Sequence, residues 1–313
     1  MITIKDFLNL VIQISTFPLP FAIRRLIFLA QGHSLSKKSY IAPFSFVLAN
    51  KLVLEDGARI SPLSIIKAQS IYLKQGSRFR YLSIGIAHTV KIGKNSQVDP
   101  FVLLNGSSLK GSEFIIGDHS RLMLFSYLDL FGSIHIGDHS HIGGRTMIFT
   151  HQAHMKSFFS GSNVTFGDVH IGNYVTVQWD CLLGCGITIG DFSHIGVKSF
   201  VSKNIAPNST VVGSRIKVYK DTNNLHLDPL FQETRLPEFN KLLKSYLSYR
   251  NLPQDELLVV YQETDLSDSN TNVHTLILKE ETLIINKKLV WLDQLEAFLD
   301  LCHINYKVVY QDD

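Results

Sequence analysis

The chain has 313 residues, of which 45% are hydrophobic and 18% are charged. That composition excludes a disordered chain, a collagen and a disulfide-stapled miniprotein, and at ~100–200 residues per domain the length predicts two domains. The 30 basic and 27 acidic residues leave a formal net charge of +3, which by itself does not argue for a nucleic-acid partner. Cys181, Cys185 and Cys302 are odd in number and unevenly spaced, so we expect reduced thiols in a reducing compartment.

The N-terminal segment, residues 1–33, is apolar but interrupted. Its prolines and arginines leave no run that approaches the ~20 apolar residues needed to span a bilayer. A signal peptide carries positive charge ahead of its apolar stretch, whereas Arg24 and Arg25 follow it. We expect two short helices around Pro18–Pro20. They either cap the next domain or lie on a membrane surface with Arg24 and Arg25 facing anionic lipid.

A repeat runs through the middle of the chain. Segments that begin with an aliphatic residue and have a small residue four places on start 19, 19, 24, 20, 35 and 18 residues apart. Their first residues are Leu54, Leu73, Ile92, Ile116, Ile136, Ile171 and Ile189. A six-residue beat of aliphatic residues runs within them, as in Ile136, Ile142, Ile148, then Ile171, Val177, Leu183, then Ile189, Ile195, Val201.

Three hexads per unit describe a triangular coil with a short strand on each side and a turn at each corner. The aliphatic first residue of a hexad points inward, and the fifth must be small because it lies near a corner. Gly, Asp and Asn occupy the corners, where turn geometry favours them. Stacked parallel coils satisfy one another's backbone hydrogen bonds. The small fifth residues are Ser120, Ser140, Thr146, Cys181, Ser193 and Ser199.

This repeat resembles that of the left-handed β-helix acyltransferases, also called hexapeptide-repeat transferases. The likeness is carried by IGDHSHIGGRTMIFTHQAH and, after a loop, by VHIGNYVTVQWDCLLGCGITIGDFSHIGVKSFVSKNIAPNSTVVGSRIKVYK. It is greatest to the bacterial polysaccharide O-acetyltransferases of the colanic acid, maltose and nodulation type. It covers residues 116–220 and extends more weakly back to residue 34. The expected fold is therefore mainly β: a left-handed parallel β-helix over residues 34–220, behind N-terminal helices.

The resemblance implies acetyl-CoA as acyl donor, bound in a groove between β-helices of adjacent subunits of a homotrimer. Basic residues would meet its phosphates. Three departures from the family pattern fall in this region, at Val177–Asp180, Cys185-Gly186 and Arg215–Lys217, so rearranged donor contacts are an alternative. The alternative to donor binding is that Lys203 and Lys217 are solvated surface lysines. For Trp179 the alternative is that it fills a subunit interface. The matched donor positions are Trp179, Val197, Ser202, Lys203 and Lys217.

The interval between Ile136 and Ile171 is about 17 residues longer than one coil, which predicts a loop within residues 149–169. Loops that project from a rigid scaffold often carry function. Acyl transfer from a thioester to a hydroxyl needs a base, and histidine titrates near neutral pH. The resemblance makes His151 the general base of a direct transfer, with backbone N–H groups stabilising the oxyanion. His154 is the reserve candidate or orients the acceptor; otherwise both are ordinary polar loop residues.

Thirteen histidines raise the question of a metal, because some hexapeptide-repeat proteins are zinc carbonic anhydrases. His119 and His139 recur at matching positions on successive coils, but the fourth position of a hexad faces outward. His135, His141 and His194 lie near similar corners, without a third ligand at coil spacing. We therefore expect no metal, and we interpret Cys181 as a small inward residue.

The C-terminal region, residues 221–313, shows no usable resemblance. After a polar link, helical spacing in LPEFNKLLKSYLSYR and WLDQLEAFLDLC predicts two helices. Strands are predicted in ELLVVYQ, VHTLILK, TLIINK and YKVVY. A small α/β domain of this kind would cap the solenoid, extend the oligomer or recognise an acceptor or partner.

The expected function is acetyl-CoA-dependent O-acetylation of a bacterial surface polysaccharide, in capsule or lipopolysaccharide, or of its precursor. The expected location is cytoplasmic, with the N-terminal helices at the inner face of the membrane, and no nucleic-acid partner is expected. Three alternatives remain open at this point. They are an N-acetyltransferase of a nucleotide-linked amino sugar, a non-catalytic scaffold that binds partners, and a zinc hydratase.

Overall fold

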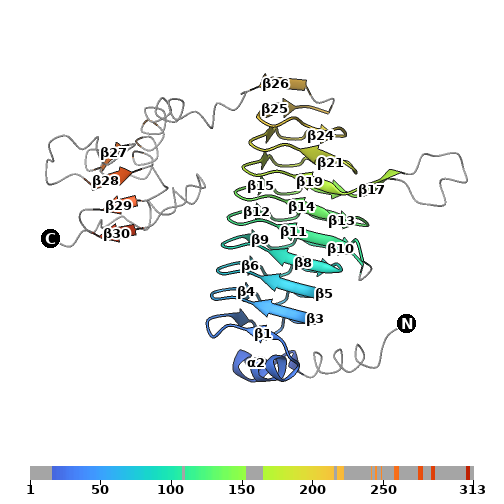
Figure 1. The fold of residues 1–313 in the computed structure, drawn as a ribbon, viewed down its shortest axis with the longest axis vertical. Helices are drawn as coiled ribbons and strands as arrows, with labels where there is room; N and C mark the ends of the chain where they lie inside the picture. Colours follow the sequence, from blue (N-terminus) through green and yellow to red (C-terminus); the bar gives the residue numbers. More distant parts are fainter. Residues whose placement is uncertain are drawn as a thin grey trace, which may run out of the picture. The chain divides into compact units, whose positions relative to one another are not determined.

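The computed structural model describes residues 16–107, 110–152, 165–214 and 217–221, single helical residues at 241, 244 and 248, and short strands beyond residue 256. The chain divides into two compact units, residues 1–223 and 224–313. The first unit is a parallel β-solenoid of about nine turns, preceded by a helix (Figure 1). The β-helix expected from the repeat is thereby confirmed as a parallel solenoid.

Each coil contributes strands to three faces, and every strand pair between successive coils is parallel up to β25. Face 1 consists of β2 (Tyr40–Ile41), β4 (Arg59–Ile60), β6 (Arg78–Phe79), β9 (Gln97–Val98), β12 (Arg121–Leu122), β15 (His141–Ile142), β20 (Thr176–Val177), β23 (His194–Ile195) and β25 (Ser209–Val212). Face 2 consists of the first halves of β3 (Phe46–Leu54) and β5 (Ile65–Leu73), then β7 (Ile84–Ile86), β10 (Leu103–Gly106), β13 (Tyr127–Leu130), β16 (Met147–Phe149), β21 (Leu182–Leu183) and β24 (Phe200–Val201). Face 3 consists of β1 (Ser34–Leu35), the second halves of β3 and β5, then β8 (Thr89–Ile92), β11 (Glu113–Ile116), β14 (Ile134–Ile136), β19 (Val169–Ile171) and β22 (Thr188–Ile189).

The register of these strands follows the hexad beat. Ile142 pairs with Val177, and Val177 pairs with Ile195 on the next coil. All three side chains are at most 1% exposed, so one column of aliphatic side chains fills the interior behind face 1. Burial of such columns supplies the main stabilisation, because about 25 cal/mol is gained for each Å² of apolar surface removed from water.

The small fifth residues of the hexads join neighbouring coils. The six side chains named above are each no more than 2% exposed. Ser120 Oγ donates to the carbonyl of Gly137 on the next coil at 2.7 Å, and it accepts the N–H of Ser140 at 2.8 Å. A longer side chain would displace this double contact. At Ser120 the fifth position therefore needs a residue that is small and that also forms hydrogen bonds to the next coil.

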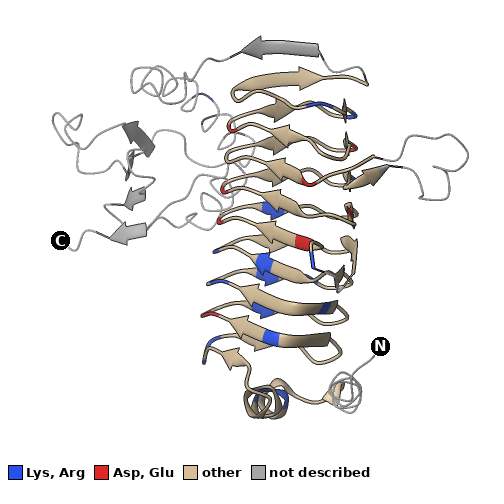
Figure 2. Cartoon of the chain, turned by 45° about the vertical axis from the view of Figure 1, so that its right-hand side comes forward, with Lys and Arg blue, Asp and Glu red and all other residues tan. Residues whose placement is uncertain are grey.

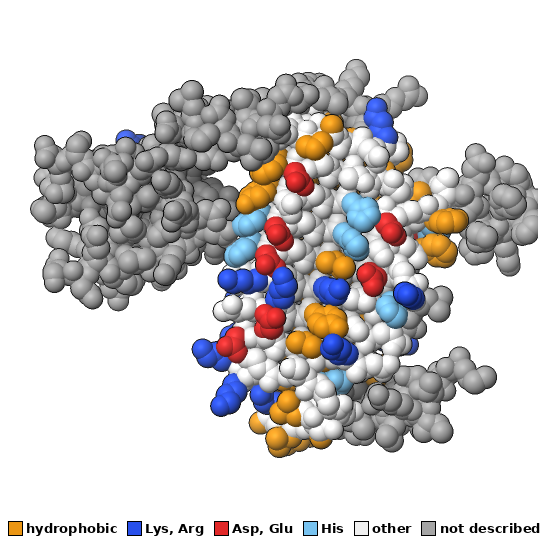
Figure 3. Space-filling model, in the orientation of Figure 1, with side chains coloured by type: hydrophobic (Ala, Val, Ile, Leu, Met, Phe, Trp, Pro, Cys, Tyr) orange, Lys and Arg blue, Asp and Glu red, His pale blue; other side chains and the backbone are white. Residues whose placement is uncertain are grey.

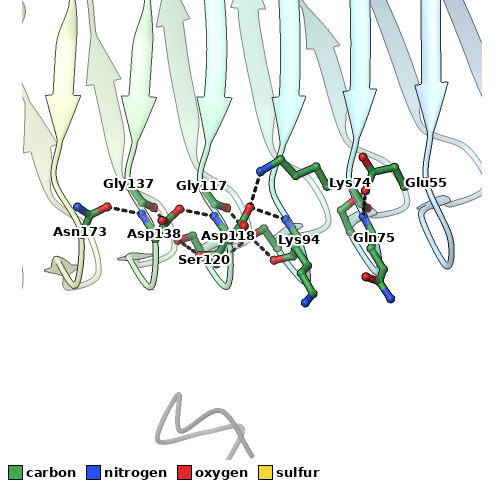
Figure 4. Close-up of polar contacts among 12 residues, drawn as sticks. Glu55, Lys74, Gln75, Lys94, Gly117, Asp118, Ser120, Gly137, Asp138 and Asn173 are labelled. Atoms are coloured by element: carbon green, nitrogen blue, oxygen red, sulfur yellow. Dashed lines mark hydrogen bonds and ion pairs between the residues drawn. The ribbon is translucent and has the colours of Figure 1, made fainter. Parts of the chain in front are cut away.

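The edge where face 3 turns into face 1, here the 3–1 edge, is a ladder of side-chain acceptors (Figure 4). Asp118 Oδ1 accepts the N–H of Lys94 at 2.8 Å, and Asp138 Oδ1 accepts the N–H of Asp118 at 2.6 Å. Asn173 Oδ1 continues the ladder to the N–H of Asp138 at 2.8 Å. The Asp or Asn after each Ile-Gly thus satisfies a turn N–H of the neighbouring coil.

At the N-terminal end of the solenoid, α2 (Phe21–Ala30) covers the first coils (Figure 1). Arg24 is 0% exposed and donates to the carbonyls of Ala42 at 2.6 Å and Ser45 at 2.8 Å, and its burial lowers the pKa of this guanidinium to about 10. Arg25 donates to a carbonyl of β1 at 2.8 Å. The alternative in which both arginines face lipid is therefore wrong, because their guanidinium groups bind the backbone of the solenoid.

Membrane contact at this end stays a prediction, and it now depends on the exposed apolar side chains Ile23, Leu26 and Leu29. Within the part of the chain that the structure describes, no helix has the length and apolar character needed to cross a bilayer.

The last strand of the solenoid unit breaks the parallel pattern. β26 (Lys217–Asp221) pairs antiparallel with β25. In the second unit, β27 (Leu257–Val260) pairs in parallel with β28 (His274–Ile277), and β29 (Leu283–Ile285) pairs in parallel with β30 (Val308–Tyr310). These four strands fall within the four predicted ones. The predicted helix at 291–302 lies outside the described residues.

Candidate functional site

The long interval in the repeat begins and ends in a pair of short strands, and we call residues 151–166 the projecting segment. β17 (His151–Gln152) pairs antiparallel with β18 (Thr165–Phe166), and this short stalk leaves the stack where face 2 turns into face 3 (Figure 1). We call this corner the 2–3 edge. Residues 153–164, which include His154, lie outside the described residues. His151 therefore stands at the junction of the rigid coil and the projecting segment.

His151 forms a hydrogen-bonding contact with a carboxylate of the preceding coil. Its Nδ1 lies 2.6 Å from Oδ2 of Asp129, which is 6% exposed at the end of β13. Because a carboxylate only accepts, Nδ1 carries the proton in the neutral ring, and the lone pair is then on Nε2. The imidazole side chain is 38% exposed, so it is accessible to a substrate. An imidazole held in this way can accept a proton at Nε2.

The backbone around this pair is fixed by Thr150. Its hydroxyl donates to the carbonyl of Asp129 at 2.8 Å and accepts the N–H of Gly132 at 2.8 Å. Thr150 is 0% exposed. The threonine before His151 therefore ties the coil of the histidine to the coil of the carboxylate and sets the distance between them.

Asp129 was missed by the sequence analysis. The register aligns Asp129 with Phe149, two residues before His151, so the two partners belong to adjacent coils. The sequence feature that could have indicated Asp129 is an acidic residue between two inward leucines, in Tyr127–Leu130, one coil before the histidine. Leu128, Asp129 and Leu130 are all buried, which is unusual for a carboxylate without a partner.

Two phenylalanines lie near the imidazole: Phe131 is in ring contact with it, and Phe166 is the register partner of His151 in the stalk. The ring of Phe131 lies 5.3 Å from that of His151 and 6.1 Å from that of Phe166. Phe131 is 62% exposed and Phe166 is 66% exposed. Figure 3 shows apolar side chains on the surface beside the base of the projecting segment. Neither phenylalanine was a predicted site residue.

The predicted donor residues Trp179 and Val197 both lie on the edge where face 1 turns into face 2, the 1–2 edge. The N–H of Lys198 donates to the carbonyl of Trp179 at 3.0 Å, so these corners stack on successive coils. A Cβ at Gly144 would lie 2.6 Å from the Trp179 ring, which packs on that glycine. Trp179 is 37% exposed and Val197 is 57% exposed.

The predicted donor residues Ser202 and Lys203 lie at the other border of face 2. Both are exposed and directly follow β24. Ile148 pairs with Leu183 and Leu183 pairs with Val201, so this turn is two coils beyond His151, about 10 Å along the 2–3 edge. Lys217 is in β26, and its side chain is not among those described. Four of the five predicted donor residues are thus divided between two edges of face 2, and Lys217 lies in β26 beside face 1.

Among the described residues, no group of three or more His, Cys, Asp or Glu side chains is arranged to hold a metal ion. His119 and His139 stack at 5.1 Å, as their matching repeat positions imply. Cys181 is 1% exposed, and burial raises the pKa of its thiol, so it is an inward packing residue.

Comparison with known proteins gives partial matches, and no family model matches the chain. It is 30% identical over 149 residues to the bifunctional protein GlmU of Blochmanniella pennsylvanica, covering 44% of this chain and 29% of the relative. It is 27% identical over 136 residues to the galactoside O-acetyltransferase of Escherichia coli, covering 42% and 64%. The chain therefore spans less than two thirds of either relative.

Solved structures with a similar solenoid include a hexapeptide-repeat acetyltransferase of Vibrio cholerae O1 biovar eltor complexed with acetyl coenzyme A. The TM-score is 0.37 at 21% identity, covering 42% of this chain and 71% of that one. For the polySia-specific acetyltransferase NeuO the TM-score is 0.43 at 17% identity, covering 66% and 91%. The parallel solenoid and the similarity to the galactoside O-acetyltransferase together confirm the resemblance to hexapeptide-repeat acetyltransferases.

Proposed function

We propose that the chain is an acetyl-CoA-dependent O-acetyltransferase in which His151 is the general base. The observation that carries this proposal is the contact of 2.6 Å between His151 Nδ1 and the buried Asp129 carboxylate. It holds a half-exposed imidazole in one tautomer at the root of a projecting segment. The similarity to a galactoside O-acetyltransferase supports the same chemistry.

In the proposed reaction, Nε2 of His151 takes the proton of an acceptor hydroxyl as that oxygen attacks the thioester carbonyl. Asp129 holds the Nδ1 proton and stabilises the imidazolium that forms. The new C–O bond makes an acetyl ester and the C–S bond breaks. His151 then returns its proton to the coenzyme A sulfur. No covalent acyl-enzyme is needed, and backbone N–H groups would stabilise the oxyanion.

The donor would lie along face 2, with Trp179 and Val197 on one border and Ser202 and Lys203 on the other. Lys203 and Lys217 would meet its phosphates through charge-assisted hydrogen bonds. The donor residues on the 1–2 edge and those on the 2–3 edge belong to separate edges of one chain. A second subunit would be needed to form a closed groove at either edge. We therefore propose a homotrimer whose sites lie between adjacent subunits.

The proposed acceptor is a hydroxyl of a bacterial surface polysaccharide, in capsule or lipopolysaccharide, or of its precursor. His154 is proposed to orient that acceptor from the projecting segment. The proposed location is the cytoplasmic side of the inner membrane, where such precursors are assembled.

Calorimetric titration of the full chain with acetyl-CoA, together with light scattering, tests the proposal. We expect micromolar binding to a species with three times the chain mass. His151→Ala should retain donor binding and lose acetyl transfer in an acceptor screen that includes amino sugars. Absence of acetyl-CoA binding in the wild-type chain would contradict the proposal and favour the scaffold hypothesis. Transfer to an amine alone would favour the N-acetyltransferase.

A further inference from the structure

We infer that Phe131 and Phe166 form a platform that receives the apolar face of a neutral pyranose ring and presents its hydroxyl to His151. This inference rests on the proposed function, because it concerns the acceptor of the same site. It assigns the acceptor contact to two residues of the solenoid and its stalk, and it predicts a preference for uncharged sugars.

The exposure of these two rings is the first observation. At 62% and 66% they are the most exposed aromatic side chains among the described residues. They do not belong to the row of exposed corner residues on the 1–2 edge, where Phe101 and Phe125 stack at 5.0 Å. Two large apolar rings left open beside a half-exposed imidazole favour a ligand that covers them.

The geometry of the rings is the second observation. The ring centroid of Phe131 lies 5.3 Å from that of His151 and 6.1 Å from that of Phe166. The Phe131 plane is tilted by 43° to that of His151 and by 54° to that of Phe166, so these rings are not stacked face to face. A pyranose has a face of C–H groups that packs on an aromatic ring, while its hydroxyls project from the rim. A sugar lying on Phe131 would bring a rim hydroxyl toward the imidazole.

Rigid contacts hold the platform at both ends. Phe131 is followed by Gly132, whose Cβ would come within 2.7 Å of Asp168 Oδ1, and by Ser133, whose N–H donates to that oxygen at 2.8 Å. Phe166 lies directly opposite His151 in the stalk. The main-chain positions of the two phenylalanines are therefore fixed, which suits a preorganised binding surface.

The charges around the platform favour a neutral ligand. Two carboxylates lie near the platform. That of Asp129 contacts His151, and that of Asp168 accepts the N–H of Ser133. Lysine and arginine positions are concentrated on the N-terminal coils, as Figure 2 shows, and Lys203 lies on this edge two coils beyond His151. On the 2–3 edge, Lys110 lies on the coil that precedes that of Phe131. An anionic sugar would have to approach the two carboxylates.

The test is saturation-transfer NMR of the full chain with the methyl β-glycopyranosides of glucose, galactose and mannose, and with methyl β-D-glucopyranosiduronic acid. The ring C–H protons of at least one neutral glycoside should be saturated in the wild-type chain. Phe131→Leu and Phe166→Leu should weaken that binding about five- to tenfold, the size expected for one aromatic contact. Phe131→Tyr should restore it. The glucuronide should bind more weakly than the glucoside.

Phe125→Leu is the matched control, because Phe125 is 52% exposed on the 1–2 edge and leucine already occupies that corner at Leu63 and Leu82. It should leave glycoside binding unchanged. Acetyl-CoA binding, measured by calorimetry, should be the same in every variant.

The inference is overturned if no neutral glycoside binds, if Phe131→Leu and Phe125→Leu bind equally, or if the glucuronide binds as tightly as the glucoside. A change in oligomer mass in Phe131→Leu would also overturn it, by assigning the rings to a subunit contact. Failure of the proposed function differs from all of these, because the wild-type chain would then not bind acetyl-CoA.

Discussion

Asp129 and Asp138 lie nine residues apart, but their carboxylates make contacts of different kinds. Asp138 accepts the N–H of Asp118 at 2.6 Å on the 3–1 edge, where neighbouring coils repeat the same contact. Asp129 contacts His151 at 2.6 Å, and its register neighbours are Asn105 and Phe149, which do not repeat the pair. In a solenoid, a polar contact that recurs on every coil stabilises the stack. A polar contact that occurs once points to function.

The largest expected effect is that of removing the imidazole from the unrepeated pair. His151→Ala should lower acetyl transfer by about 10²–10⁴-fold, the range associated with a general base. The unfolding midpoint should fall modestly, because the buried Asp129 carboxylate loses its contact with the imidazole but keeps the Thr150 hydroxyl at 3.3 Å. Steady-state kinetics and thermal unfolding measure the two quantities. The control is His141→Gln on face 1, and equal loss of activity in both variants would contradict a specific role for His151.

Exchanging the two carboxylates for amides compares the two aspartates directly. Asp129→Asn should lower kcat by about 10²-fold, because an amide does not stabilise the imidazolium and allows the wrong tautomer. Asp138→Asn should leave kcat unchanged and alter stability by less than about 0.5 kcal/mol, because Asn173 already accepts the same kind of N–H. A larger loss of activity in Asp138→Asn than in Asp129→Asn would reverse the comparison.

Lys203 tests whether the 2–3 edge also holds the donor. Lys203→Ala should raise the KM for acetyl-CoA about fivefold with kcat unchanged, and the effect should shrink as salt is added. Lys67→Ala is the control, since Lys67 is an exposed lysine of β5 on an N-terminal coil. If the two variants have the same donor KM, Lys203 is a solvated surface lysine.

The smallest expected effect is a loss of folding stability at low pH, caused by partly buried histidines in strands of the repeat. Burial lowers the pKa of His135, with a further contribution from His170, and burial lowers the pKa of His194. The unfolded chain therefore binds more protons than the folded one as pH falls below the ordinary histidine value of 6.5. Stability present above that pH is lost as pH falls through the folded-state pKa values.

Thermal unfolding between pH 7 and pH 5 measures this loss. The drop should be smaller in the double variant His135→Gln/His194→Gln, which has no proton to gain at these sites. An unchanged drop would assign the pH dependence to other groups.

Much of the solenoid follows from the sequence. The intervals of the repeat are the intervals of the strand register, as the pairings of Ile142, Val177 and Ile195 show. The reason is local: each hexad contains its own inward aliphatic residue, small corner residue and turn, so spacing alone specifies which residues stack. The long interval before Ile171 likewise marked the projecting segment, and its Thr-His start placed His151 at the segment's root.

The tertiary structure decided the contacts between coils that no spacing rule describes. Asp129 belongs to the coil before His151, and only the register with Phe149 brings the carboxylate to the imidazole. Arg24 was assigned to lipid as one alternative, but its buried guanidinium donates to the carbonyls of Ala42 and Ser45 in the first coil. The hexad repeat determined how each coil is built. Which single side chains meet across coils depended on the stacking of the whole solenoid.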